Sequence, residues 1–212
     1  MKEKNDDLKE LKESVASNET YRETGYRSKD TKRLATLDLI YSAIIGVLGG
    51  IISSLIPFSL LIKVWYPFTG GTQLVSGHHV IWGVIVYGLT KSKKDIVLTM
   101  TSKGILEFLL GDPWGLIILL VNVVEGLLLS LGFLLMELLG EGESKLGWGL
   151  AGALGNCFQA PFFWIINQRW YLHWSLWALA FIFAIISGIL ITGLLGRTIK
   201  NGLIKAGVPT TF

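Results

Sequence analysis

The sequence lacks most of the features by which an enzyme can be recognised. It has a single cysteine, Cys157, which lies in an apolar run, so neither a disulfide framework nor a thiolate metal centre is expected. It contains no Gly-x-Ser-x-Gly, no His-Glu-x-x-His and no glycine-rich phosphate loop with its lysine. We therefore expect no enzymatic activity, no cofactor and no nucleic-acid partner, and any ATP would have to be hydrolysed by other chains.

Charge is scarce beyond the first 33 residues. That segment holds nine of the 19 basic and eight of the 16 acidic residues of the chain. Over all 212 residues, 51% are hydrophobic and the mean hydropathy is +0.53, which is far above that of a water-soluble domain with a charged surface. These values predict an all-α integral membrane protein in a lipid bilayer, with a polar arm at 1–33, a membrane domain at 34–197 and a tail at 198–212.

Six apolar stretches are candidates for helices that cross about 30 Å of hydrocarbon. They lie at 37–62, 74–89, 96–110, 116–139, 146–166 and 174–195, the third being short and interrupted by polar residues. The lysines at 91–94 and the basic residues at both ends of the chain fall on one side of this arrangement. By the positive-inside rule, we predict a bundle of about six transmembrane helices with both termini cytoplasmic.

Two glutamates lie inside these apolar stretches. Glu107 precedes the turn Gly111-Asp-Pro-Trp-Gly115, and Glu125 follows it in the next stretch, one turn after Asn122. A charge at membrane depth costs about 2.5 to 3.5 kcal/mol on insertion scales, so such residues usually bind something or pair with a partner. In the six-span arrangement they converge on the outer half of the bundle with His79 and Gln159, which predicts a cavity for a small polar or cationic ligand.

Simpler interpretations stay open for these residues. Lys103 lies four residues before Glu107, so the two side chains can neutralise each other, and Lys103 can equally pair with Glu125. His78 and His79 are adjacent, and adjacent helical residues point about 100° apart. We expect no metal site there, because no cysteine or carboxylate stands at ligand spacing from the pair.

Small residues recur every four positions along the first span. Ser42, Gly46, Gly50 and Ser54 form a stripe on one helical face, which lets another helix approach closely. The sequence predicts a docking surface, and it leaves open whether the surface is used inside the bundle or with a partner chain.

Three strings resemble the YkoE-type substrate-binding S components of energy-coupling factor (ECF) transporters. They are Thr36-Leu-Asp-Leu-Ile, the string from Glu107 to Gly115, and Asn122-Val-Val-Glu-Gly126, and the resemblance extends from Thr36 to Leu195. It implies a subunit of the bacterial plasma membrane that captures a vitamin or vitamin precursor on the outside. Such a subunit docks on a transmembrane coupling protein powered by two cytoplasmic ATPases, and the small-residue stripe looks like the face that S components use for this contact.

The resemblance also implies a ligand. YkoE-type proteins are associated with thiamine or its hydroxymethylpyrimidine precursor, for which Glu107 and Glu125 would supply carboxylates and Trp82, Trp114 or Trp164 would stack on the rings. Cobalamin ranks second, since related S components carry it. Two functions of other classes stay beside these: an ion-coupled secondary carrier with a titrating glutamate, and a membrane scaffold whose carboxylates are structural.

Overall fold

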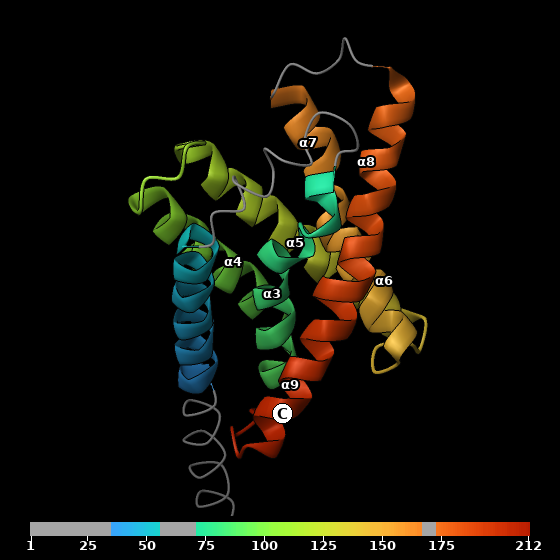
Figure 1. Cartoon of the computed structure of the whole chain (residues 1–212). Coiled ribbons are helices and arrows are strands. Elements are labelled where there is room, and N and C mark those ends of the chain that lie inside the picture. The colour runs from blue at the N-terminus through green and yellow to red at the C-terminus, as the bar shows by residue number, and fades with distance from the viewer. Residues whose placement is uncertain (1–34, 56–70, 167–172) are drawn as a thin grey trace, which may run out of the picture. The chain divides into compact units, whose positions relative to one another are not determined.

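The computed structural model describes residues 35–55, 71–166 and 173–212, and every regular element within them is helical (Figure 1). The chain begins there with the helix Ala35–Leu55, followed by η1 (Gly71–Leu74), α3 (Gly77–Thr90), α4 (Lys93–Leu109), α5 (Leu116–Leu138), α6 (Lys145–Cys157), α7 (Gln159–Ile166), α8 (Trp174–Ser187), η3 (Gly188–Leu195) and α9 (Gly196–Lys205). The predicted all-α fold is confirmed. The arm predicted at 1–33 and the end of the first predicted span lie outside the described residues.

Four helical segments are long and apolar enough to cross a membrane. They are Ala35–Leu55, Leu116–Leu138, Lys145–Ile166 and Trp174–Lys205. The second and third predicted spans are shorter helices, because α3 has 14 residues and α4 has 17. Their polar groups are kept from lipid by the neighbouring helices: Lys103 and Glu107 of α4 are 0% and 1% exposed. Burial of this kind is what a bilayer requires of a polar segment.

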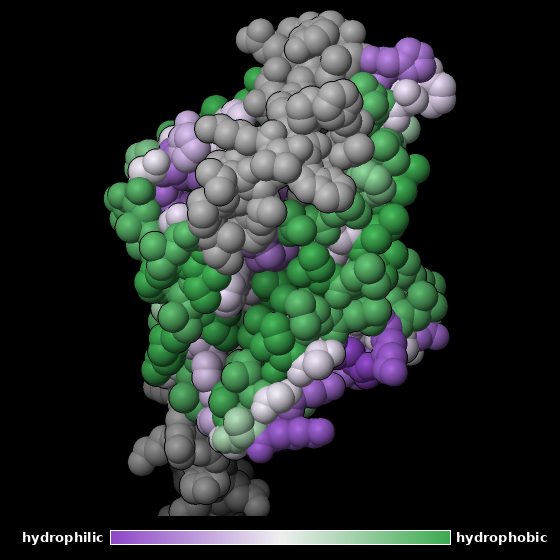
Figure 2. Space-filling model, viewed as in Figure 1, coloured by the Kyte–Doolittle hydropathy of each residue, from purple (hydrophilic) through white to green (hydrophobic). Residues whose placement is uncertain are grey.

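The surface has the composition expected of a membrane protein. Figure 2 shows apolar side chains across the middle of the visible described face, with hydrophilic ones gathered toward its ends. Large apolar residues are exposed on the outward sides of the long helices, among them Leu120, Leu127 and Leu131 of α5. A water-soluble protein rarely shows so much contiguous apolar surface, so this chain is a multi-pass membrane protein.

A break separates α6 from α7 at Phe158. Pro161 explains it, because proline has no N–H to donate to the carbonyl of Cys157 four residues earlier, and its ring collides with that carbonyl. The break lies inside a segment that is otherwise long enough to be one span. It places Gln159 at the start of a new helix, where its side chain reaches the interior of the bundle and is 3% exposed.

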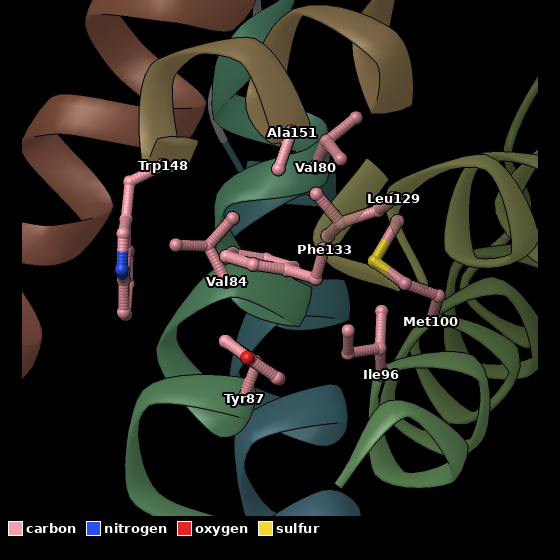
Figure 3. Packing of buried hydrophobic residues seen from close by; sticks show 9 residues of the cluster. All are labelled: Val80, Val84, Tyr87, Ile96, Met100, Leu129, Phe133, Trp148 and Ala151. Carbon is pink, nitrogen blue, oxygen red and sulfur yellow. The ribbon is translucent and has the colours of Figure 1, made fainter. Parts of the chain in front are cut away.

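The apolar core joins α3, α4, α5 and α6 (Figure 3). Its centre is aromatic: the rings of Tyr87 and Phe133 stack at 3.8 Å, and the ring of Trp148 meets Phe133 edge-on at 5.3 Å. The remaining members are aliphatic or small: Val80, Val84, Ile96, Met100, Leu129 and Ala151. Packing rather than the hydrophobic effect joins helices in lipid, so this close fit holds the four helices in place around the polar residues.

The small-residue stripe of the first described helix packs inside the bundle. Ser42, Gly46 and Gly50 are buried, and Ser54 is exposed. A Cβ at Gly46 would lie 2.7 Å from the carbonyl oxygen of Thr99, and one at Gly50 would lie 2.9 Å from Cβ of Leu106, so the helix approaches α4 at glycine distance. Of the two uses that the sequence leaves open, contact within the bundle is the one seen here. A contact of the stripe with a coupling protein stays a prediction.

Candidate functional site

Lys103, Glu107 and Asn122 form a buried network between α4 and α5. The ammonium of Lys103 donates to Glu107 Oε1 at 2.7 Å and to Asn122 Oδ1 at 2.8 Å. The amide of Asn122 donates to Glu107 Oε2 at 2.7 Å and to the carbonyl of Ile118 at 2.8 Å. Both oxygens of Glu107 therefore have partners, and the carboxylate of Glu107 is the one that Lys103 neutralises.

The two helices approach closely because α4 has a glycine at the crossing. A Cβ at Gly104 would lie 2.9 Å from Cβ of Asn122 and 3.0 Å from Cα of Leu119. With no side chain there, α5 comes near enough for the amide of Asn122 to bridge Lys103 and Glu107. His79 of α3 completes the group, with its Nδ1 3.8 Å from Glu107 Oε1. Sequence reasoning therefore selected three residues, Glu107, Asn122 and His79, that do lie together.

Glu125 lies one turn further along α5 in a different environment. It is 1% exposed, and its Oε1 has no hydrogen-bond partner among the described residues. Gln159, Lys103 and Glu107 are the polar side chains close enough to act on this carboxylate. A buried carboxylate is normally saturated with donors or paired with a cation. Glu125 is therefore a buried carboxylate that is short of a partner among the described residues.

A second polar network joins the start of α3 to α6, α7 and α8. The hydroxyl of Ser76 donates to the carbonyl of Gln73 at 2.8 Å and accepts from Nδ2 of Asn156 at 2.7 Å. The same amide donates to the carbonyl of Ala184 at 2.7 Å. Gln159 Nε2 lies 3.5 Å from the carbonyl of Ser76, so Gln159 links this network to Glu125.

The long last span holds the first residue of α3 from both sides. The N–H of Gly77 donates to the hydroxyl of Ser187 at 2.9 Å, and the hydroxyl of Thr192 donates to the carbonyl of Gly77 at 2.9 Å. Ser187 ends α8, and Thr192 lies in the π-helical segment η3. Because His78 and His79 follow directly, this clamp fixes where the histidines meet α4. Sequence reasoning missed Ser76, Asn156, Ser187 and Thr192; the signal available was small polar residues inside apolar spans.

The turn between α4 and α5 requires its glycines. Gly111 and Gly115 have φ of +84° and +58°, and nothing lies within 4 Å of either missing Cβ, so conformation rather than space selects glycine there. Asp112 accepts a hydrogen bond from the N–H of Trp114 at 2.8 Å. Burial raises the pKa of the Asp112 carboxyl, and that hydrogen bond opposes the rise. The turn therefore fixes the last turn of α4, which carries Glu107.

The three tryptophans selected from the sequence lie in different places. Trp82 packs on the first described helix, where a Cβ at Gly49 would lie 2.7 Å from its ring. Trp114 is half-buried in the 111–115 turn. Trp164 packs on a cluster of alanines of α7 and α8, which are Ala160, Ala180 and Ala184. A stacking role for these rings stays a prediction.

Metal-ligand side chains are sparse in the described part of the chain. No group of three histidine, cysteine, aspartate or glutamate side chains within it lies close enough together to hold a metal ion. His79 and Glu107 are the two such groups that meet beside Lys103.

The structure is a helical membrane bundle with two buried carboxylates, Glu107 and Glu125, in its interior, which is where binding sites for polar molecules or ions occur in membrane proteins. The chain belongs to the family described as the permease component of an ABC-type cobalt transport system, whose model matches residues 37–156. Its fold is similar to the crystal structure of an S-component of an ECF transporter, with a TM-score of 0.72 and 20% sequence identity over 81% of this chain and 86% of that chain. No curated protein matches the chain. The resemblance to S components is confirmed at the level of the fold, and the YkoE type stays a prediction.

Proposed function

We propose that the protein is the substrate-binding subunit of an ECF-type ABC importer. It captures a vitamin or vitamin precursor at an outward-facing site, and thiamine or hydroxymethylpyrimidine is the ligand that we propose first. It then delivers the ligand through a transmembrane coupling protein driven by two cytoplasmic ATPases. The family match and the S-component fold support this class of protein, and Glu125 supports the presence of a ligand.

The partner that Glu125 lacks supports a cationic ligand. Lys103 and Glu107 balance each other's charges, so an ionised Glu125 would add one negative charge for which no cation lies at ion-pair distance among the described residues. An uncompensated buried charge is strongly unfavourable. A ligand with a positive charge, or with an N–H directed at Oε1 of Glu125, would complete the cluster. An aminopyrimidine or a thiazolium has this chemistry.

The Lys103, Glu107 and Asn122 network has a supporting role in this proposal. Its hydrogen bonds are already satisfied within the protein, so a ligand gains little by replacing one of them. It places the positive charge of Lys103 near Glu125 and keeps α4 and α5 in register. We therefore assign direct ligand contact to Glu125 and Gln159, and we assign Glu107 and Asn122 to the wall that positions them.

A cobalt ion is a second candidate, because the family description names cobalt transport. His79 and Glu107 are suitable ligand types, and they lie 3.8 Å apart. Cobalamin, the other vitamin named by the resemblance, is the larger cobalt-containing alternative. A titration with Co²⁺ beside a vitamin panel separates these ligands from thiamine and its pyrimidine.

The first test is calorimetry on Glu125→Gln in detergent, after native mass spectrometry of the purified protein has identified a co-purifying molecule. We expect the wild type to bind the ligand alone and Glu125→Gln to weaken binding by about 1.5 to 3 kcal/mol, the worth of a hydrogen bond to a charged group. Glu141→Gln is the matched control, because Glu141 is exposed in the loop after α5.

The outcomes separate the three classes of function. An S component binds its ligand alone and transports only with the ATPase module. A protein that transports alone in liposomes would be an ion-coupled carrier instead. A protein that binds neither Co²⁺ nor any vitamin of the panel, and whose stability alone changes in Glu125→Gln, would be a scaffold.

A further inference from the structure

A cavity lies at the other end of α3, far along the helix from His79. Its volume is about 560 Å³. The end of α3, the turn after α5 and α9 surround it, and its charged and aromatic lining residues are Tyr87, Lys91, Glu137, Glu143, Lys200 and Phe212. None of these residues belongs to the proposed ligand site.

Aromatic rings hold two ammonium groups in this cavity. Lys91 Nζ lies 5.1 Å from the ring centre of Tyr87, 5.3 Å from that of Trp148 and 5.4 Å from that of Phe212. Lys200 Nζ lies 5.4 Å from the ring centre of the same Trp148. These distances are typical of cation–π contacts. Two cations on one ring repel each other, so an anion between them would be stabilising.

The lining contains two lysines and two glutamates, and one of these glutamates is paired with a lysine outside the lining. Lys91 pairs with Glu143, whose side chain is 65% exposed, and Lys93 pairs with Glu137 at 2.5 Å. Within the described residues, Lys200 has no carboxylate at ion-pair distance.

Arg197 adds a positive charge at the edge of the cavity, and a glycine of α3 makes room for Lys200. The guanidinium of Arg197 donates to the backbone carbonyl of Glu143 at 2.8 Å and thus leaves its charge uncompensated. Glycine provides the space for Lys200, since a Cβ at Gly88 would lie 2.9 Å from the Cβ of that lysine. The position of Lys200 in α9 therefore depends on the glycine at position 88 of α3.

The cavity lies at the depth of lipid headgroups. The span Trp174–Lys205 has 32 residues, which is about 48 Å of helix, against about 30 Å of hydrocarbon. If the exposed Trp174 marks one membrane boundary, as aromatic residues do, Lys200 is about 39 Å away and has passed the other boundary. Three leucines at this end, Leu138, Leu139 and Leu146, are 63–74% exposed and offer contact to acyl chains.

We propose that this cavity binds the phosphate of an anionic lipid headgroup, held by Lys200 and Lys91 with Arg197 at its edge. The basic end of the bundle faces the cytoplasm by the positive-inside rule, and anionic lipids attract basic residues at that surface. Glu143 competes with the phosphate for Lys91 and swings outward when the lipid binds. The two ammonium groups attract the phosphate of any phospholipid and repel a cationic group such as choline. The site therefore favours a lipid whose headgroup has a net negative charge.

The test is native mass spectrometry of the full chain in a neutral detergent with added dihexanoylphosphatidylglycerol. We expect binding of this lipid, weaker binding of dihexanoylphosphatidylcholine, and a loss of about fivefold in Lys200→Met, since one lysine near an anionic surface contributes about 1 kcal/mol. Lys205→Met is the matched control, because Lys205 is exposed at the end of the same helix. Inorganic phosphate is titrated separately, and binding as tight as that of the lipid would identify a free phosphate group as the ligand.

A variant with the opposite sign guards against misfolding. Glu143→Gln releases Lys91 from its ion pair, so phosphatidylglycerol should bind up to about fivefold more tightly. If Lys200→Met binds the lipid as well as Lys205→Met does, or if Glu143→Gln binds it no more tightly than the wild type, the assignment is wrong. Neither result depends on the proposed ligand site around Glu125.

Discussion

Lys103 shows how strongly a single side chain can control this interior. It is fully buried, and within the described part of the chain it is the cation that contacts both Glu107 and Asn122. Removing it leaves the carboxylate of Glu107 buried with only an amide and a histidine beside it. The loss of one partner from a buried pair typically costs about 3 to 5 kcal/mol, much more than an exposed pair contributes.

We therefore expect Lys103→Met to destabilise the ligand-free protein by about 3 to 5 kcal/mol, as measured by thermal unfolding in detergent. The double variant Lys103→Met with Glu107→Gln should recover part of this loss, because no charge is then left unpaired. Lys94→Met, at an exposed position of the same helix, should be nearly neutral. Equal unfolding temperatures for the single and double variants would show that charge pairing is not the reason for the loss.

At the same scale, the sequence predicted part of the site from local spacing. Lys103 and Glu107 lie four residues apart, and Asn122 and Glu125 lie three apart, so each pair shares a helical face by geometry alone. The choice of Lys103 between the two glutamates could not be predicted, because it depends on how closely α5 approaches Gly104. The contact between Asn156 and Ser76 joins residues 80 positions apart, and no periodicity in the chain indicates it.

At the scale of elements, the junction between α8 and η3 holds the start of α3. The N–H of Gly77 is one of the first amides of α3, which no helix can satisfy internally, and Ser187 accepts from it. The hydroxyl of Thr192, about one turn after Ser187, donates to the carbonyl of the same glycine. A Cβ at Gly77 would lie 2.6 Å from the carbonyl oxygen of Ser187, so the contact also depends on glycine.

We expect Ser187→Ala to destabilise the protein by about 1 to 3 kcal/mol, because the buried N–H of Gly77 loses its partner. We expect a smaller loss of about 0.5 to 1.5 kcal/mol in Thr192→Val, because the carbonyl of Gly77 keeps its bond within α3. Thr198→Val is the matched control. Its hydroxyl bonds the carbonyl of Leu194 at an exposed position, where water can take over. Chemical unfolding in detergent measures all three, and a loss in Thr198→Val as large as that in Thr192→Val would contradict the role of the clamp.

From its hydropathy, 146–166 is predicted as one continuous span, but the helix breaks at Phe158, and this break has a local cause. Pro161 interrupts the fifth predicted span for the reason that proline interrupts any helix. The π-helical turns of η3 have no such cause in the sequence, because 188–195 reads as an ordinary apolar helix. Hydropathy alone also predicted α3 and α4 as spans like the others. Both are shorter than the other spans, and the polar residues of α4 can lie at membrane depth because the helices around them bury them.

At the scale of the whole molecule, variants of the small-residue stripe test whether this surface contacts a coupling protein. Gly46 and Gly50 are occupied by α4, so a bulky residue there acts first on the bundle. Gly46→Leu would bring its Cβ to 2.7 Å from the carbonyl oxygen of Thr99. Overpacking of this kind commonly costs about 1 to 3 kcal/mol, and we expect a fall of the unfolding temperature together with weaker ligand binding.

Ser54 offers the cleaner test of docking, because it ends the stripe at an exposed position. If the stripe also meets a coupling protein, Ser54→Leu should keep the stability and ligand affinity of the wild type and lose ATP-driven uptake in liposomes that contain the ATPase module. Leu55→Ala, at its exposed neighbour on another side of the helix, serves as the control. Uptake that is undiminished in Ser54→Leu would restrict the stripe to packing within the bundle and would move the partner surface to the outward-facing apolar residues of the same helix, such as Val47 and Ile51.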